Sequence, residues 1–171
     1  MDELQRFINA YRSRASSSAK SRLDVLMAVE RISDARVVLF LVSVLEDRRE
    51  TVEVRTYALQ QIRCRRELIS LATEPTVAKA IADTLADRKN PGLRIQAALA
   101  LGDFTQIDRV LRQLNAVCLA QDESIDLRYA AFTSLEQAGP TPECIELLRR
   151  MTGDETLGLS ARSVLSAWHI Q

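Results

Sequence analysis

Apolar residues recur every three to four positions along almost the whole chain, which is the spacing of one face of an α-helix. In the segment 37–45 the apolar residues at positions 37, 41, 44 and 45 have this spacing, and in the segment 107–114 those at 107, 110, 111 and 114 have it. Strict alternation of apolar and polar residues, which is typical of strands, is rare. The pattern therefore predicts an all-α protein.

Short breaks rich in Ser, Asp, Asn, Gly and Pro, the residues that favour turns, separate the periodic stretches. They lie at 16–18, 47–50, 90–92, 121–124, 139–140 and 153–154. The predicted helices span 2–14, 19–32, 34–46, 51–64, 75–88, 91–103, 106–120, 125–138, 141–151 and 157–169. Connections this short make consecutive helices antiparallel. We expect hairpins at roughly 2–32, 34–64, 75–103, 106–138 and 141–169, within a single domain 1–171.

A motif recurs through the chain at a spacing of about 35 residues, which is the length of a two-helix repeat. It reads LEDRRETVEVRTYALQQI at 45–62, LADRKNPGLRIQAALALG at 85–102 and LAQDESIDLRYAAFTSLE at 119–136. Each copy has an acidic turn, an apolar residue, an Arg and an Ala three positions after it. The arginines are Arg55, Arg94 and Arg128, and we place Arg22 and Ser160 at the equivalent position upstream and downstream. The segment 63–75 is an insertion, in which we expect an extra turn of helix.

This pattern resembles the HEAT repeat, including the short bacterial variety similar to that of phycobilin lyases. The resemblance implies a right-handed α-α superhelix, an α-solenoid of about five HEAT-like hairpins. It also implies a structural ladder of Asp and Arg residues that pair within and between units. Its expected members are Asp47, Arg55, Asp87, Arg94, Asp122 and Arg128. The first unit lacks the acidic turn and the last has Ser160 where Arg is usual, as terminal units of solenoids often differ.

Three positions on the second helix of each hairpin share one face: the residue before the Arg, the Ala three after it and the apolar residue seven after it. We expect this stripe to pack on the first helix of the same hairpin, with the small Ala allowing a close approach. Its members are Val54, Ala58 and Ile62, then Leu93, Ala97 and Leu101, then Leu127, Ala131 and Leu135.

The composition of the chain disfavours some kinds of partner and some cellular compartments. The chain has 23 basic and 23 acidic residues, so no overall field attracts it to nucleic acid or to an anionic membrane. It has no run of about 18 apolar residues and no signal-peptide pattern, so we expect no membrane contact. Its three cysteines form no CxxC pair, which indicates a reducing compartment rather than disulfides or zinc. We expect a cytoplasmic protein.

The residue types that carry catalysis are poorly placed for it. Asp47, Asp87, Asp122 and Asp154 precede helices, where acidic residues satisfy free backbone N–H groups and complement the helix dipole. His169 is the only histidine and lies two residues from the end, where chains are commonly loosely held. We therefore expect no enzyme, no metal site and no cofactor.

A basic run, RCRR, places Arg63, Arg65 and Arg66 around Cys64. This basic patch candidate could meet a phosphate or an acidic peptide. The alternative is that the arginines are cations favourably placed at a helix C-terminus, with Glu67 nearby. We favour the second interpretation.

The outward side of the second helices carries apolar and aromatic residues in the later units. By resemblance to HEAT proteins this side is the concave face, and its binding candidates are Ile95, Leu99, Tyr129, Leu165 and Trp168. Exposed apolar area and aromatic anchors are typical of interfaces. The alternative is that these side chains pack between neighbouring second helices.

The leading functional hypothesis is a scaffold or adaptor that binds a peptide or helix of a protein partner on this face. One alternative is a chromophore lyase or chaperone similar to phycobilin lyases, which needs a pocket for a tetrapyrrole. Another is a DNA-binding or DNA-repair protein similar to the HEAT-like alkylpurine glycosylases. That class needs a basic groove with aromatics, which a neutral chain with one Trp near its end fits poorly.

Overall fold

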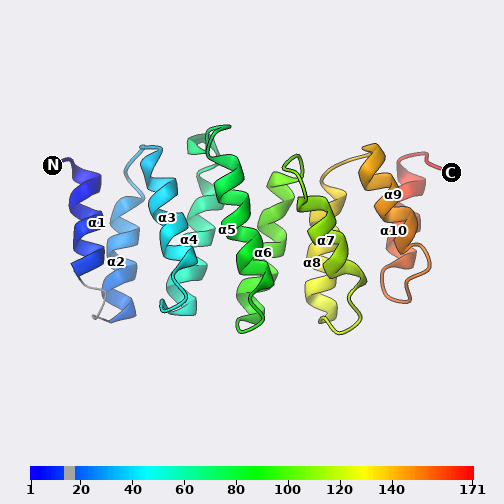
Figure 1. Cartoon of the computed structure of the whole chain (residues 1–171), viewed down its shortest axis with the longest axis horizontal. Helices are drawn as coiled ribbons and strands as arrows, with labels where there is room; N and C mark the ends of the chain where they lie inside the picture. Colours follow the sequence, from blue (N-terminus) through cyan, green and yellow to red (C-terminus); the bar gives the residue numbers. More distant parts are fainter. Residues whose placement is uncertain (14–17) are drawn as a thin grey trace. The chain divides into compact units, whose positions relative to one another are not determined.

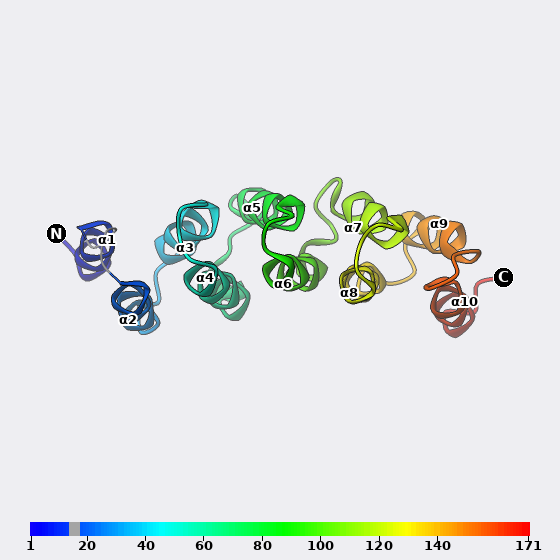
Figure 2. The same ribbon diagram turned by 90° about the horizontal axis from the view of Figure 1, so that it is seen from below.

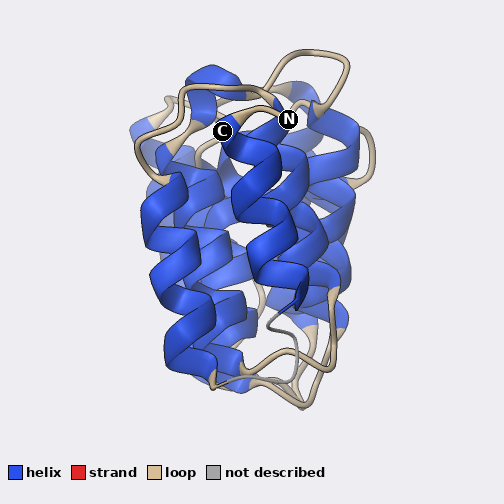
Figure 3. Cartoon of the chain, turned by 90° about the vertical axis from the view of Figure 1, so that its left-hand side faces the viewer, coloured by secondary structure: helices blue, strands red, loops and turns tan. Residues whose placement is uncertain are grey.

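A computed structural model describes residues 1–13 and 18–171. This part of the chain consists of helices and loops, without a strand (Figure 3). The α-helices are α1 (Glu3–Ser13), α2 (Ala19–Val29), α3 (Arg36–Glu46), α4 (Val52–Cys64), α5 (Glu74–Ala86), α6 (Pro91–Leu101), α7 (Val110–Leu119), α8 (Ile125–Glu136), α9 (Pro142–Met151) and α10 (Gly158–Ala167). Two 3-10 helices, η1 (Arg66–Leu68) and η2 (Gly102–Phe104), follow α4 and α6. The all-α prediction is confirmed.

The chain divides into two compact units, Met1–Thr84 and Leu85–Gln171. The boundary falls inside α5, so the predicted hairpin 75–103 spans both units and its pairing stays a prediction, as does the single domain. In unit 1, α1, α3 and α5 form one layer and α2 and α4 the other (Figure 2). In unit 2, α7 and α9 form one layer and α6, α8 and α10 the other. Consecutive helices of a unit run antiparallel (Figure 1).

Hydroxyl side chains and prolines mark the starts of several helices. Each capping hydroxyl accepts a hydrogen bond from the backbone N–H three residues on, which satisfies one of the free donors of the first turn. The caps are Ser18, Thr51, Ser124 and Thr141. Pro91 and Pro142 occupy the first helical turn, where the missing N–H has no cost.

The helix ends agree with the predicted ones to within about four residues, the usual margin for boundaries. The largest difference is at α7, which begins at Val110 instead of 106. The chain first makes the η2 turn and then passes through Arg109, whose φ of 73° is left-handed and does not continue a helix. The break predicted at 16–18 and the predicted helix end at 14 lie largely outside the described residues.

The predicted stripe of the second helices is buried throughout: all nine side chains, from Val54 to Leu135, are at most 2% exposed. Within the units, α4 packs on α3 and α8 packs on α7. In unit 2, α8 also packs closely on α6, where the buried Ser134 hydroxyl donates to the carbonyl of Ala98 at 2.7 Å. A Cβ on Gly102 would lie 2.3 Å from the Oε1 of Gln137, the end of a flexible side chain that would have to shift.

The insertion at 63–75 forms the 3-10 turn η1, so the extra helical turn expected there is confirmed. None of the described helices combines the length and the apolar composition needed to cross a bilayer.

Candidate functional site

One buried arginine lies on the second helix of several hairpins. Arg22, Arg55, Arg94 and Arg128 are each less than 9% exposed. The Nε of Arg55 donates to the carbonyl of Leu45 at 2.8 Å, near the end of the preceding helix. Arg94 and Arg128 repeat this bond with Leu85 and Cys118, each at 2.7 Å. The guanidinium therefore satisfies carbonyls that the helix leaves free at its C-terminus.

The same guanidinium groups bind carboxylates. Arg22 lies 2.7 Å from Glu50, and Arg94 lies 2.7 Å from Glu123. Burial alone would raise the pKa of Glu50, but hydrogen bonds from Arg22, Tyr11 and the Thr51 N–H outweigh it and lower that pKa. The Arg94 guanidinium likewise lowers the pKa of Glu123. These carboxylates are therefore ionised structural partners at neutral pH.

Two acidic members of the predicted ladder, Asp47 and Asp122, are placed differently. Asp47 pairs with Arg49, and Asp122 pairs with Arg88 on the surface. Asp87 is buried and accepts hydrogen bonds from the Lys89 N–H and the Asn90 side chain within its own turn. Asp47 and Asp122 do not cap the helices that follow them, because Thr51 and Ser124 are the caps of α4 and α8.

The carboxylates that meet Arg22 and Arg94 come instead from Glu50 and Glu123, each directly before a helix-capping residue, Thr51 or Ser124. An acidic residue immediately ahead of a Ser/Thr cap is the signal in the sequence that would have identified them, and the predicted ladder missed it.

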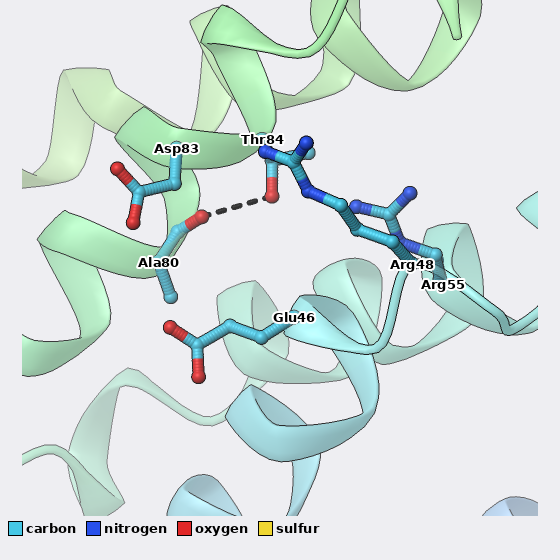
Figure 4. A pocket seen from close by; sticks show the side chains of 6 residues that line it. All are labelled: Glu46, Arg48, Arg55, Ala80, Asp83 and Thr84. Atoms are coloured by element: carbon cyan, nitrogen blue, oxygen red, sulfur yellow. Dashed lines mark hydrogen bonds between the residues drawn. The ribbon is translucent and has the colours of Figure 1, made fainter. Parts of the chain in front are cut away.

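A charged hollow of about 180 Å³ opens in unit 1 (Figure 4). Its lining consists of Glu46, Arg48, Arg55, Ala80, Asp83 and Thr84. The Thr84 hydroxyl donates to the carbonyl of Ala80 at 2.8 Å, and Asp83 pairs with Lys79 at 2.6 Å. Both of these bonds lie within α5, whereas the bond from Arg55 to the carbonyl of Leu45 joins α4 to α3.

The RCRR run forms no open basic patch. Arg65 is 9% exposed and donates to the carbonyls of Ile32 and Val29, at the end of α2. Arg66 lies 3.9 Å from Glu74, and Arg63 is half-buried. The favoured interpretation, cations placed at a helix C-terminus, fits these contacts, although the helix that Arg65 completes is α2 and not its own helix α4.

In α10 the predicted register is wrong by two residues. The buried stripe runs through Leu157, Ala161 and Leu165, so the position of the ladder arginine falls on Gly158 and not on Ser160. Leu165, predicted to lie on the outward face, is only 7% exposed. The backbone leaves no room for a side chain here, since a Cβ on Gly158 would lie 2.7 Å from the carbonyl of Thr152. Arg162, one turn later, donates to that carbonyl instead.

With the corrected register, the outward side of α6, α8 and α10 in unit 2 carries an apolar row. Ile95, Tyr129 and Leu159 each follow the ladder position by one residue. Ile95 is half-buried, whereas Tyr129 is 41% and Leu159 is 71% exposed. The neighbouring members are Leu99, half-buried, and Ile125, 60% exposed, one helical turn before Tyr129. We call this surface the α6–α8–α10 face.

Tyr129 connects two helices of this face. Its hydroxyl donates to the carbonyl of Thr156, in the loop that leads into α10, at 3.2 Å. The ring is thereby tied to the segment before α10, and much of its surface remains accessible. Trp168, the remaining candidate, ends α10 and is half-buried.

The thiols of Cys118 and Cys144 are buried in the core. Burial raises the pKa of Cys118 to about 12 and that of Cys144 to about 11, so both stay protonated at neutral pH. Each thiol donates to a backbone carbonyl, of Arg128 and Leu135 respectively. Within the described residues, no three His, Cys, Asp or Glu side chains come together as a metal site would require.

The sequence matches no protein-family model and no curated protein.

Proposed function

We propose that the chain is a HEAT-like repeat protein, with its hairpins stacked as an α-solenoid, and that it acts as a scaffold or adaptor by binding a segment of a protein partner. The binding surface is the α6–α8–α10 face, and the role is recognition rather than catalysis. Three free cysteines suit a cytoplasmic setting, where thiols stay reduced.

The observation that carries the proposal is the exposed row of Tyr129 and Leu159, extended by Ile125. Isolated apolar residues on a surface need no explanation, but exposed apolar residues at the equivalent position of successive second helices are typical of an interaction site. Burying one such side chain contributes about 1.5 to 3 kcal/mol. Tyr129 suits an anchor because its ring is rigid and its hydroxyl is already bound to Thr156, so little conformational freedom remains to be lost on binding.

The test compares partner capture by the wild type with that by the double variant Tyr129→Ala/Leu159→Ala. We expect bound partner to fall about tenfold or more, since truncation of an interface anchor costs over 1 kcal/mol. The matched control is Leu119→Ala, which removes a side chain that is 36% exposed at the end of α7, outside this face. Urea unfolding of each variant separates lost binding from lost folding.

Equal capture by the wild type and the double variant, with both folded, would exclude the α6–α8–α10 face as the binding surface. Equal loss in the double variant and in Leu119→Ala would do the same, because the effect would not depend on the face.

A further inference from the structure

Two adjacent residues of α8, Arg128 and Tyr129, bind the same residue in front of α10. Arg128 donates from Nη1 to the Thr156 hydroxyl at 3.2 Å, and the Tyr129 hydroxyl donates to the Thr156 carbonyl, also at 3.2 Å. Arg128 is buried, whereas Tyr129 is 41% exposed. Thr156 therefore connects a buried side chain of α8 to the exposed aromatic ring that follows it.

Asp154 fixes the backbone of this segment. Its Oδ1 accepts from the N–H groups of Thr156 and Leu157, at 2.9 and 2.8 Å. A carboxylate that accepts from the N–H two residues on closes a local turn. Its Oδ2 accepts from Arg128 Nη2 at 2.6 Å and from the Gln121 side chain at 2.8 Å. The buried pair of Arg128 and Asp154 thus holds the segment 154–157, whose Thr156 carbonyl binds Tyr129.

The neighbouring second helices of unit 2 have no tyrosine at this place. In α6 the residue after the ladder arginine Arg94 is Ile95, which has no polar side-chain group. Arg94 forms the same kind of buried pair, with Glu123 at 2.7 Å. In α10 the corresponding residue is Leu159. In unit 2 the combination of a buried ion pair with an adjacent tyrosine is therefore particular to α8.

From these contacts, and resting on the proposed function, we infer that the Arg128–Asp154 pair positions Tyr129 for binding, by holding the Thr156 carbonyl where it accepts the Tyr129 hydroxyl. The pair is buried and acts through Thr156, so it is a positioning element and does not itself contact the partner. A ring that is already held loses less conformational freedom when a partner covers it, and binding is stronger for that reason.

The first test observes Tyr129 in the free full chain. The chain is labelled with fluorotyrosine at its three tyrosines, and fluorine NMR records their signals. The signal of Tyr129 is the one that Tyr129→Phe removes. In Asp154→Asn the amide nitrogen that replaces Oδ2 cannot accept from Arg128, so the turn is released. We expect the Tyr129 signal to narrow and to move toward its position in the urea-unfolded chain, while the signals of Tyr11 and Tyr57 in unit 1 stay in place.

The matched control is Glu123→Gln. It disrupts the other buried pair of unit 2, that with Arg94, and leaves Asp154 and Thr156 as they are. The Tyr129 signal should therefore keep its wild-type position in this variant. A role in stability alone would make both buried pairs equivalent in this measurement.

Thr156→Val is a milder second variant. It removes only the hydroxyl that accepts from Arg128 and keeps nearly the same side-chain volume. The Tyr129 signal should move in the same direction as in Asp154→Asn, by a smaller amount. This variant decides the question if Asp154→Asn fails to fold.

The second test measures capture. Its probe is the protein that the wild-type chain captures and that Tyr129→Ala/Leu159→Ala fails to capture. We expect Tyr129→Phe and Asp154→Asn each to lower capture of this protein by about two- to tenfold, the cost of ordering one free side chain. Because both changes release the same ring, their effects should not add, and Tyr129→Phe/Asp154→Asn should bind as weakly as either single variant.

The inference is overturned if Asp154→Asn, or Thr156→Val in its place, leaves the Tyr129 signal unchanged, or if Glu123→Gln moves it as far. Additive losses of capture in the double variant overturn it as well, since the pair would then act independently of Tyr129. The proposed function fails by a different result, namely capture that survives Tyr129→Ala/Leu159→Ala. The two failures are distinguishable, because the fluorine signals are measured without a partner.

Discussion

Arg128 and Asp154 form a buried ion pair in unit 2, with Nη2 and Oδ2 2.6 Å apart and side chains only 3% and 4% exposed. Arg128 also bonds to the carbonyl of Cys118, and Asp154 accepts the backbone N–H groups of Thr156 and Leu157. This one pair therefore connects α8, which carries Arg128, to the end of α7 and to the start of α10. Such full hydrogen bonding is what allows two charges to be buried.

Breaking this pair from the acidic side should be costly. Asp154→Ala leaves the Arg128 charge buried without its partner and removes the turn before α10, so we expect a loss of about 3 to 5 kcal/mol in the free energy of unfolding. Urea denaturation measures it. Glu146→Ala, which breaks the exposed pair with Arg150 on α9, should change stability by at most about 0.5 kcal/mol. Similar losses in the free energy of unfolding of the two variants would show that burial does not strengthen the Arg128–Asp154 pair.

Stability should fall as the solution is acidified. Burial alone would raise the pKa of Asp154, but the N–H groups of Leu157 and Thr156, the Gln121 amide and Arg128 outweigh it and lower that pKa to about 2, from an ordinary value of 3.8. Since the folded pKa is below the unfolded one, the stabilisation is complete above pH 3.8 and is lost as the pH falls through 2.

The pH dependence is measured by urea midpoints between about pH 5 and pH 2, with Asp154→Asn as the comparison. We expect the wild type to lose stability more steeply than Asp154→Asn in the lower part of that range. Parallel profiles would mean that other groups account for the acid sensitivity.

Replacement of Gly158 by alanine should destabilise the protein. In Gly158→Ala the new methyl group meets the Thr152 carbonyl, which is backbone and cannot move freely, so we expect a loss of about 1 to 3 kcal/mol. Gly92→Ala in α6 is the matched control, because nothing lies within 4 Å of its Cβ position. There the gain in helix propensity should stabilise by about 0.5 to 1 kcal/mol. The thermal unfolding midpoints of both variants measure these effects. A stabilised Gly158→Ala variant would refute the register that places Gly158 of α10 against Thr152.

Ala131 tests the packing of α8. It is fully buried in the stripe that includes Leu127 and Leu135, so Ala131→Leu forces neighbouring helices apart and should cost about 1 to 3 kcal/mol. Ala167→Leu adds the same atoms to an exposed position of α10 and should be nearly neutral. An unchanged urea midpoint for Ala131→Leu would show that the contact yields without strain.

The positions of the helices and of the buried stripe follow from the sequence alone. A helix presents every third or fourth residue to the same side, so the apolar spacing around Val54, Ala58 and Ile62 determines which face is covered. Turn residues between the periodic stretches delimit the helices. Both signals are local, and each can be recognised without knowledge of what the helix contacts.

Tertiary structure decided which residues meet and which stay accessible. Glu50 and Glu123, not Asp47 and Asp122, reach the arginines, because pairing depends on where each turn ends in space. In α10 the apolar residues allow two registers, and the close contact of Gly158 with Thr152 selects the one that buries Leu165 and exposes Leu159. Neither outcome is encoded in a single periodic pattern, since both depend on the backbone of a neighbouring segment.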